Sequence, residues 1–351
     1  MPAKVWPEEL SEREREVLRV ITEEHIVAGE PVGSRSVTRK HGFHLSPATI
    51  RNIMADLEEM GYLAQPHTSA GRIPTDLGYR FYVDFLMNRC RLSRAEEHRI
   101  ERQFAPVREA GEPLLETTTG VLSNLSQVVG IVLGPRADQV AIRQVEFIHL
   151  VGERILVILI TQSGHVERKV IVIDEVLSQE ELGRIARCLN DIVEGLTLRE
   201  VRKRLVERME EERAQYDDLL RRALSLGQRT FMSSGAGEVY IRGTANIMDQ
   251  PEFADIEKMR ALFAAFEDKA RLVKILDACL AEQGLTIRIG SENSDHHLQG
   301  LSLVIAPYGM EMGMVGVVGV IGPTRMEYSK IIPLVDFTAR LVERYLSEGS
   351  A

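Results

Sequence analysis

Apolar residues recur with the period of an amphipathic helix in three segments near the N-terminus. Helices are expected over 11–28, over about 34–41 and over 46–60. In the third segment, Ser46 followed by Pro47 has the order of an N-cap and a first helical residue. The apolar positions of that segment form one stripe, made of Ile50, Ile53, Met54 and Leu57. The opposite side of this helix is therefore expected to face away from the core.

A hairpin and an aromatic helix are expected next. Residues 62–64 and 72–73 flank a polar, turn-rich segment, which is typical of a two-stranded hairpin. Three helices followed by a hairpin predict a winged helix-turn-helix domain over residues 1–92. Thr75 can cap a further helix, whose aromatic residues are expected to pack against the first helix or against a partner subunit. The highly charged segment 93–110 predicts a linker helix.

A sheet is expected beyond the linker. A helix begins near residue 111, and short Gly-containing turns then separate four apolar runs, which predicts antiparallel strands. The runs lie at 129–133, 140–150, 155–161 and 166–173.

The strand pattern is interrupted and then resumes. Charged helices dominate from about 178 to 283, including a long one near 199–226, and the Gly-rich segment 233–243 is interpreted as a loop. Strands return at 286–289, 301–307 and 312–321, followed by a helix over about 327–346. The simplest fold class is α+β and multidomain, with one antiparallel α+β domain split by a helical insertion. The expected boundaries are 111–177 and 261–351 for the split domain, and 178–260 for the insertion.

Charge is unevenly distributed along the chain. The formal net charge of −9 argues against a polyanion-binding surface spread over the whole molecule. In contrast, no acidic residue occurs between Glu30 and Asp56, and a second acid-free run spans 60–75. Any nucleic-acid site is therefore expected to be local and N-terminal.

The third helix is the candidate recognition helix, because in a helix-turn-helix the second of the two helices enters the major groove. Arg can pair bidentately with guanine and Asn with adenine, and small neighbours let the helix sit deep. The groove-facing candidates are Ala48, Thr49, Arg51 and Asn52. Phosphate contacts are expected from the preceding helix at Ser34, Arg35, Ser36, Arg39 and Lys40, and from Ser46 at the helix N-terminus. The hairpin, with His67, Thr68, Ser69 and Arg72, is expected to contact the DNA backbone or the minor groove.

Other chemistry is weakly indicated. The three cysteines form no CxxC pair, which favours a reduced cytoplasm, and no secretory or membrane-spanning segment is expected. Catalytic motifs are absent, so enzyme activity, a metal site and a cofactor are not expected. His296 and His297 beside Asp295 are interpreted as a loop. The glycines between 309 and 322 are interpreted as part of a strand with close backbone packing. Whether the α+β domain has a ligand pocket is left open by the sequence.

The N-terminal segments resemble the signature of the HrcA family of heat-shock repressors. The resemblance lies in SPATIRNIMADLEEMGYL at 46–63 and QPHTSAGRIPTDLGYRFYVD at 65–84. Weaker similarity continues in GSRSV at 33–37, LFAAFEDKARLVKIL at 262–276 and IGPTRMEYSKIIPLVDF at 321–337.

This resemblance implies a winged helix, a GAF-like domain and an inserted dimerising domain. It further implies a homodimer that binds an inverted-repeat operator called CIRCE upstream of chaperone operons, and that needs the GroE chaperonin to stay active. Two other functions remain open at this point. One is a regulator whose α+β domain senses a metabolite, and the other is an interaction or scaffold protein that shares only the fold.

Overall fold

The computed structural model describes most of the 351-residue chain. The described residues are 10–41, 45–67, 70–88, 91–110, 113–136, 141–162, 166–173, 177–198, 200–201, 203–205, 207, 218–231, 238–248, 250, 256–280, 284–309 and 315–348. The chain divides into two compact units. One consists of 1–132, 239–307 and 317–342, and the other of 133–238, 308–316 and 343–351.

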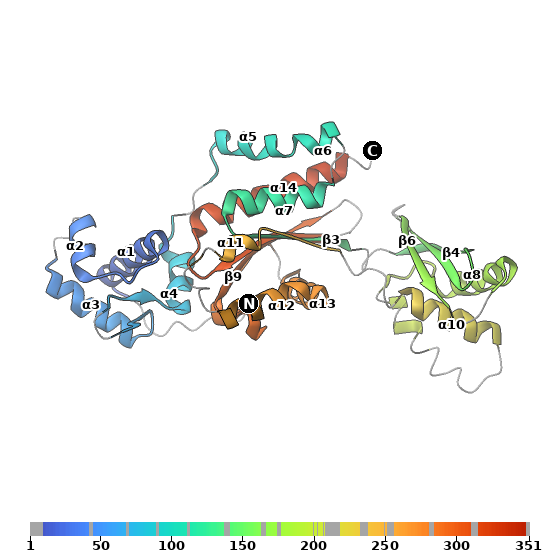
Figure 1. The fold of residues 1–351 in the computed structure, drawn as a ribbon, viewed down its shortest axis with the longest axis horizontal. Coiled ribbons are helices and arrows are strands. Elements are labelled where there is room, and N and C mark those ends of the chain that lie inside the picture. The colour runs from blue at the N-terminus through green and yellow to red at the C-terminus, as the bar shows by residue number, and fades with distance from the viewer. Residues whose placement is uncertain are drawn as a thin grey trace. The chain divides into compact units, whose positions relative to one another are not determined.

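The first unit begins with the three predicted helices and the predicted hairpin (Figure 1). The helices are α1 (Glu12–Ala28), α2 (Ser34–His41) and α3 (Pro47–Glu59), and the hairpin pairs β1 (Leu63–Ala64) with β2 (Ile73–Pro74) in antiparallel register. Their shared core contains Val17, Ile21, Ile50, Leu57 and Tyr62. Burial of these apolar side chains against one another is what holds three short helices together.

Local sequence signals account for where these helices begin and end. Ser11 and Glu14 form a complete capping box at α1, which ends at Gly29 with φ of 72°. The left-handed conformation at that position favours glycine. The sequence-predicted helix boundaries are therefore confirmed to within a residue or two.

The aromatic helix packs within its own chain. It consists of α4 (Asp76–Phe81) and a π-helical turn, η1 (Tyr82–Leu86). Tyr79 and Phe81 are buried, and the Tyr79 hydroxyl lies 2.6 Å from Nδ1 of His25 on α1. Of the two packing partners expected from the sequence, the first helix is the one observed.

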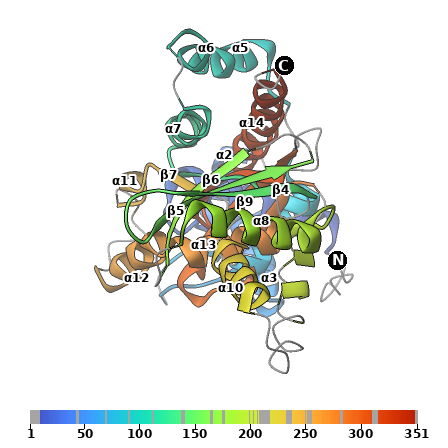
Figure 2. The same ribbon diagram turned by 90° about the vertical axis from the view of Figure 1, so that its right-hand side faces the viewer.

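A five-stranded sheet forms the centre of the rest of this unit. The strand order is β7 (Val239–Arg242), β3 (Val129–Arg136), β10 (Val315–Pro323), β9 (Leu301–Gly309) and β8 (Thr286–Ile289), and β8 pairs with β9 antiparallel. Helices cover both faces in the views of Figures 1 and 2. One face carries α7 (Leu114–Ser126) and α14 (Tyr328–Glu348), and the other α12 (Ile256–Glu267) and α13 (Lys269–Leu280). A short helix, α11 (Ala245–Met248), follows β7.

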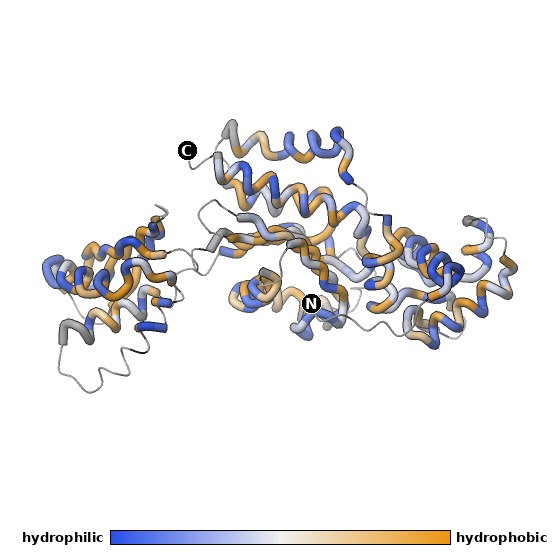
Figure 3. The backbone as a smooth tube through the Cα atoms, turned by 180° about the vertical axis from the view of Figure 1, so that it is seen from behind, coloured by the Kyte–Doolittle hydropathy of each residue, from blue (hydrophilic) through white to orange (hydrophobic). Residues whose placement is uncertain are grey.

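Burial on both faces explains the continuous apolar character of the central strands. Figure 3 colours the sheet mostly as hydrophobic, whereas the helices alternate between hydrophobic and hydrophilic residues. Within β10, a side chain at Gly319 would place its Cβ only 2.5 Å from the carbonyl oxygen of Val304 on β9. This contact confirms close backbone packing at one of the glycines expected to provide it.

The second unit has a sheet of its own. Strands β4 (Ile142–His149), β5 (Arg154–Thr161) and β6 (Val166–Val172) form an antiparallel meander. One face of this meander shares a core with α8 (Gln179–Val193) and α10 (Asp218–Phe231). Asn190 of α8 satisfies backbone groups of the edge strand β4. Its side-chain amide accepts a hydrogen bond from the Val145 amide and donates one to the Val145 carbonyl.

The domain boundaries expected from the sequence need correction. Strands β4, β5 and β6 had been assigned to the split α+β domain at 111–177, but they pack with α8 and α10 in the inserted unit. The insertion therefore begins after β3, which ends at Arg136, instead of at 178, and it is mixed α and β instead of helical. Alternation along a strand shows which face is buried, but it does not show which sheet the strand joins.

Two further expectations differ locally. The segment 233–243 was interpreted as a loop, yet residues 239–242 form β7 at the edge of the five-stranded sheet. The predicted linker helix is two helices, α5 (Arg94–Gln103) and α6 (Ala105–Ala110), which are separated at the fully buried Phe104. Within the expected helix at 199–226, residues 208–217 lie outside the described residues. The broad expectation of a multidomain α+β protein with antiparallel pairing is confirmed.

Candidate nucleic-acid interface

Helix α3 has one buried face and one open face. Ile50, Met54 and Leu57 are buried, as expected from their spacing. The exposed face presents Ser46, Ala48, Thr49, Arg51, Asn52 and Ala55. This face is nearly free of bulky groups, so a major groove about 12 Å wide could accept it without obstruction.

The N-terminal end of α3 is electropositive and ordered by its cap. The Ser46 hydroxyl accepts a hydrogen bond from the Thr49 amide at 3.1 Å, and the two hydroxyl groups lie 3.0 Å apart. Arg51 adds a full positive charge on the first turns, whereas the acidic residues Asp56 and Glu59 lie toward the opposite end. Because the N-terminus of a helix also carries a partial positive charge, an anion is favoured at the Ser46 end.

Among its described side chains, helix α2 supplies two further exposed cations. Arg35 and Arg39 are exposed, while Ser34 is only partly so. The Ser36 hydroxyl donates a hydrogen bond of 2.8 Å to Glu24 on α1, so this group holds α2 in place instead of pointing to solvent. Lys40 belongs to α2, but its side chain lies outside the described residues.

The hairpin is closed by hydrogen bonds across its tip. Gln65 Nε2 donates to the Ala70 carbonyl at 3.0 Å, the Ala70 amide donates to the His67 carbonyl, and the His67 side chain is exposed. Thr68 and Ser69 lie outside the described residues. Within the described part of the hairpin tip, His67 is therefore the exposed polar side chain.

Arg72 lies at the base of the hairpin, not at its tip. Its guanidinium forms a 2.7 Å ion pair with Glu58 of α3, and its side chain is 18% exposed. The backbone of Arg72 also bridges to Val32, and a Cβ at the neighbouring Gly71 would lie 2.3 Å from the Val32 carbonyl oxygen. Gly71 is thus needed for the close approach of the hairpin backbone to Val32.

A second cluster lies at the short 3-10 helix η4 (His296–Leu298), a segment interpreted from the sequence as a loop, where Asp295, His296 and His297 bring their possible metal-ligand atoms within 4.8 Å of one another. Asp295 is already engaged, because one oxygen accepts the His297 amide at 2.9 Å and the other lies 3.6 Å from Nε of Arg271. A neighbouring pocket includes Arg271, Lys274 and Asp268, and Arg271 also faces Asp268 at 3.6 Å. These pairings engage both oxygens of Asp295, one of the three possible ligands.

Within the residues that the structure describes, no helix combines the length and apolar character needed to cross a bilayer.

Comparisons with known proteins identify relatives of the whole chain. Residues 112–332 match the family model described as the HrcA protein C terminal domain. A heat-inducible transcription repressor HrcA of Geobacter sulfurreducens is 48% identical over 96% of this chain and 98% of its own length. The same-named protein of Syntrophobacter fumaroxidans is 42% identical over 97% of this chain and 98% of its own. A crystal structure of a hypothetical protein covers 97% of this chain and 99% of that chain, at 26% identity and a TM-score of 0.56.

Proposed function

Because the chain belongs to the HrcA family of heat-inducible transcription repressors, we propose that it represses heat-shock chaperone operons by binding an operator DNA as a homodimer. The observation that carries this proposal is the open face of α3, with Arg51 and Asn52 beside a capped, electropositive helix end. The relatives are heat-inducible transcription repressors, and DNA is the partner that this face fits chemically. A DNA partner also implies that the protein works in the cytoplasm.

In the proposed complex, the helices and the hairpin act together as a winged helix-turn-helix. The leading end of α3 enters the major groove, where Arg51 and Asn52 contact base edges through side-chain hydrogen bonds. Arg35 and Arg39 on α2 lie against phosphates and set the register, as does Lys40. The hairpin tip, with His67, Thr68 and Ser69, approaches the DNA backbone or the minor groove. Arg72, at the base of the hairpin, holds the hairpin against α3 through its ion pair with Glu58.

The operator in this proposal is the inverted repeat CIRCE, which a two-fold symmetric dimer would match. The sheet of the inserted unit supports self-association, because one face packs on α8 and α10 while the other carries exposed apolar residues. Cross-strand pairing places Ile148, Leu156 and Val170 in one row of this open face. The neighbouring row of the same face holds Glu146, Ile158 and Arg168, so the apolar row beside it is the part of this face that supports a protein interface.

The five-stranded sheet with helices on both faces is, in this proposal, a GAF-like domain, and GroE is the partner that maintains the active repressor. The support for both is the family relationship. Heat-damaged proteins would occupy the chaperonin, so that the repressor loses this partner and the operons are expressed. Adding purified GroE to an operator-binding assay is the direct measurement.

The DNA-binding proposal is tested by selecting bound fragments from random duplexes with the full-length chain. We expect a palindromic sequence to be recovered, and equal, weak binding to every duplex with or without GroE would contradict the proposal. On the selected site, Arg51→Ala and Asn52→Ala are each expected to cost about 1–3 kcal/mol at particular base pairs. Arg39→Ala is the matched control, because loss of a phosphate contact weakens binding to all sequences about equally.

Dimerisation is tested at the open sheet face. Val170, which is 43% exposed, lies on the edge strand β6 in the apolar row of this face, so Val170→Glu is expected to raise the dimer dissociation constant at least about tenfold, because it buries a charge in an apolar interface. Sedimentation velocity over a concentration series measures this. Val151→Glu is the control, since Val151 is 86% exposed in the turn between β4 and β5. If both variants behaved alike, this face would not be the dimer interface.

A further inference from the structure

Helix α4 is firmly attached to the DNA-binding helices on one side. Thr75, its N-cap, donates a 2.6 Å hydrogen bond to the carbonyl of Gly61, directly after α3. A Cβ at Gly78 would lie 2.2 Å from the carbonyl oxygen of Tyr62, so the backbones of α4 and the hairpin touch there. Displacement of α4 must therefore move the end of α3 with it.

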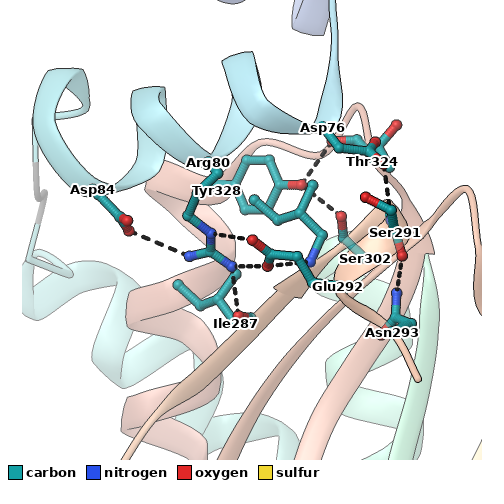
Figure 4. A network of polar contacts seen from close by, with 12 residues as sticks. Asp76, Arg80, Asp84, Ile287, Ser291, Glu292, Asn293, Ser302, Thr324 and Tyr328 are labelled. Carbon is teal, nitrogen blue, oxygen red and sulfur yellow. Dashed lines mark hydrogen bonds and ion pairs between the residues drawn. The ribbon is translucent and has the colours of Figure 1, made fainter. Parts of the chain in front are cut away.

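The other side of α4 is attached to the five-stranded sheet through Arg80, which is buried (Figure 4). Its Nε donates to Glu292 at 2.9 Å, and a second guanidinium nitrogen pairs with the other oxygen of the same carboxylate. That nitrogen also donates to the carbonyl of Ile287 on β8 at 2.7 Å. Burial alone would lower the pKa of Arg80, but the hydrogen bonds and charges of Glu292 and Asp84 raise it, so the guanidinium stays charged in this buried place.

Asp76 adds a second bond one turn earlier on α4. Its carboxylate accepts the amide of Ser291 at 2.8 Å and lies directly against Gly290, which has a φ of +51°. A Cβ at Gly290 would lie 2.2 Å from this carboxylate, so no larger residue fits between the two surfaces. The loop is held in shape by the buried Asn293, whose amide donates to the carbonyls of Gly290, Leu298 and Leu301.

A separate contact fastens helix α1. Arg325, between β10 and α14, donates to the carbonyl of Ile26 at 3.0 Å and to Gln250 at 3.1 Å. The buried Tyr328 packs its ring near that of Tyr79, with centroids 6.3 Å apart, and its hydroxyl donates to the Thr324 carbonyl. The DNA-binding helices are thus held at two points, α4 and the end of α1.

From this geometry we infer that Asp76, Arg80 and Glu292 are positioning residues that make the DNA-binding helices and the five-stranded sheet one rigid body. The inference rests on the proposed dimer and inverted repeat. It has a direct consequence for the specificity of DNA binding. Given a dimer that fixes the two five-stranded sheets relative to each other, the two recognition helices are held at a set separation, and the protein then discriminates between operators by the spacing of their half-sites. Flexibly tethered helices would tolerate changes in spacing.

The test introduces one methyl group at the contact between Gly290 and Asp76 and leaves every charged residue unchanged. Gly290→Ala puts a methyl group against Asp76 and is expected to push the two surfaces apart. Gly300→Ala is the matched control, because Gly300 has a φ of +90° and a Cβ there would meet nothing within 4 Å. Both substitutions place alanine at a left-handed backbone position, which is strained. Only Gly290→Ala places its methyl group in the contact with α4.

Both variants and the wild type are examined as full-length protein in two assays. In scanning calorimetry, the wild type and Gly300→Ala are expected to unfold the DNA-binding helices together with the sheet, whereas Gly290→Ala gives a separate, earlier transition. In binding assays, two base pairs inserted between the half-sites rotate one of them by about 70°. The wild type and Gly300→Ala should lose about tenfold or more in affinity for the altered operator, and Gly290→Ala less than about threefold, with equal affinities for a single half-site.

The two assays separate failure of this inference from failure of the proposed function. If the wild type itself showed no preference for an inverted repeat, the dimeric operator model would be wrong. If Gly290→Ala unfolded and discriminated as Gly300→Ala does, the rigid coupling through α4 would be wrong, whatever the DNA sequence preferred. Should Gly290→Ala fold poorly, Asp76→Ala removes the Ser291 bond without adding a methyl group, and the same outcomes apply to it.

Discussion

Raising the salt concentration from about 50 to about 200 mM is expected to weaken operator binding by about a thousandfold. The reason is the number of free cations on the proposed interface. Arg35, Arg39 and Arg51 are exposed in each subunit, and a dimer would place roughly six such charges near phosphates. Each neutralised phosphate releases condensed counterions, which contributes about −0.9 to the slope of log affinity against log salt. Fluorescence anisotropy of a labelled operator over a salt series measures this slope.

Two comparisons make this prediction specific. Arg39→Ala should reduce the slope by about two for the dimer, because one phosphate contact is lost in each subunit. An unrelated duplex should show a similar slope at lower affinity, since phosphate contacts carry no sequence information. Binding that changed only a few-fold over this range would mean that these arginines do not lie along the DNA backbone.

Replacing Glu292 by Ala is expected to lower the free energy of unfolding by about 3–5 kcal/mol. The substitution removes the main partner of Arg80, whose side chain is only 11% exposed, and it leaves a positive charge in a place that water reaches poorly. The backbone amide of Ile289 also loses the carboxylate that it donates to at 3.0 Å. Urea denaturation followed by circular dichroism of the full-length chain measures the loss.

The control for this prediction is Asp84, the other carboxylate that pairs with Arg80. Asp84 contacts Arg80 at 3.3 Å but is 37% exposed, so Asp84→Asn is expected to cost no more than about 1 kcal/mol. A double variant that also replaces Arg80 by Met should recover much of the stability lost in Glu292→Ala, since no unpaired charge remains. Equal effects of the Glu292 and Asp84 substitutions would show that burial does not set the strength of this ion pair.

Much of the candidate DNA interface could be predicted from the sequence, because its elements are local. The spacing of Ile50, Met54 and Leu57 identified the buried side of α3, and hence the open side with Arg51 and Asn52. Ser36 and Arg72 could not be assigned in this way. Their partners, Glu24 and Glu58, are 12 and 14 residues distant, and only packing brings them into contact.

The sequence by itself determined the helices, their caps and most of the strands, because periodicity and capping depend on residues a few positions apart. Tertiary structure alone decided which strands share a sheet, so that β4, β5 and β6 form the core of the insertion while β7 returns to the five-stranded sheet. It also decided that Arg80 meets Glu292, 212 residues further along the chain. Such pairings arise from burial against distant segments, and no local pattern of residues encodes which distant segment that is.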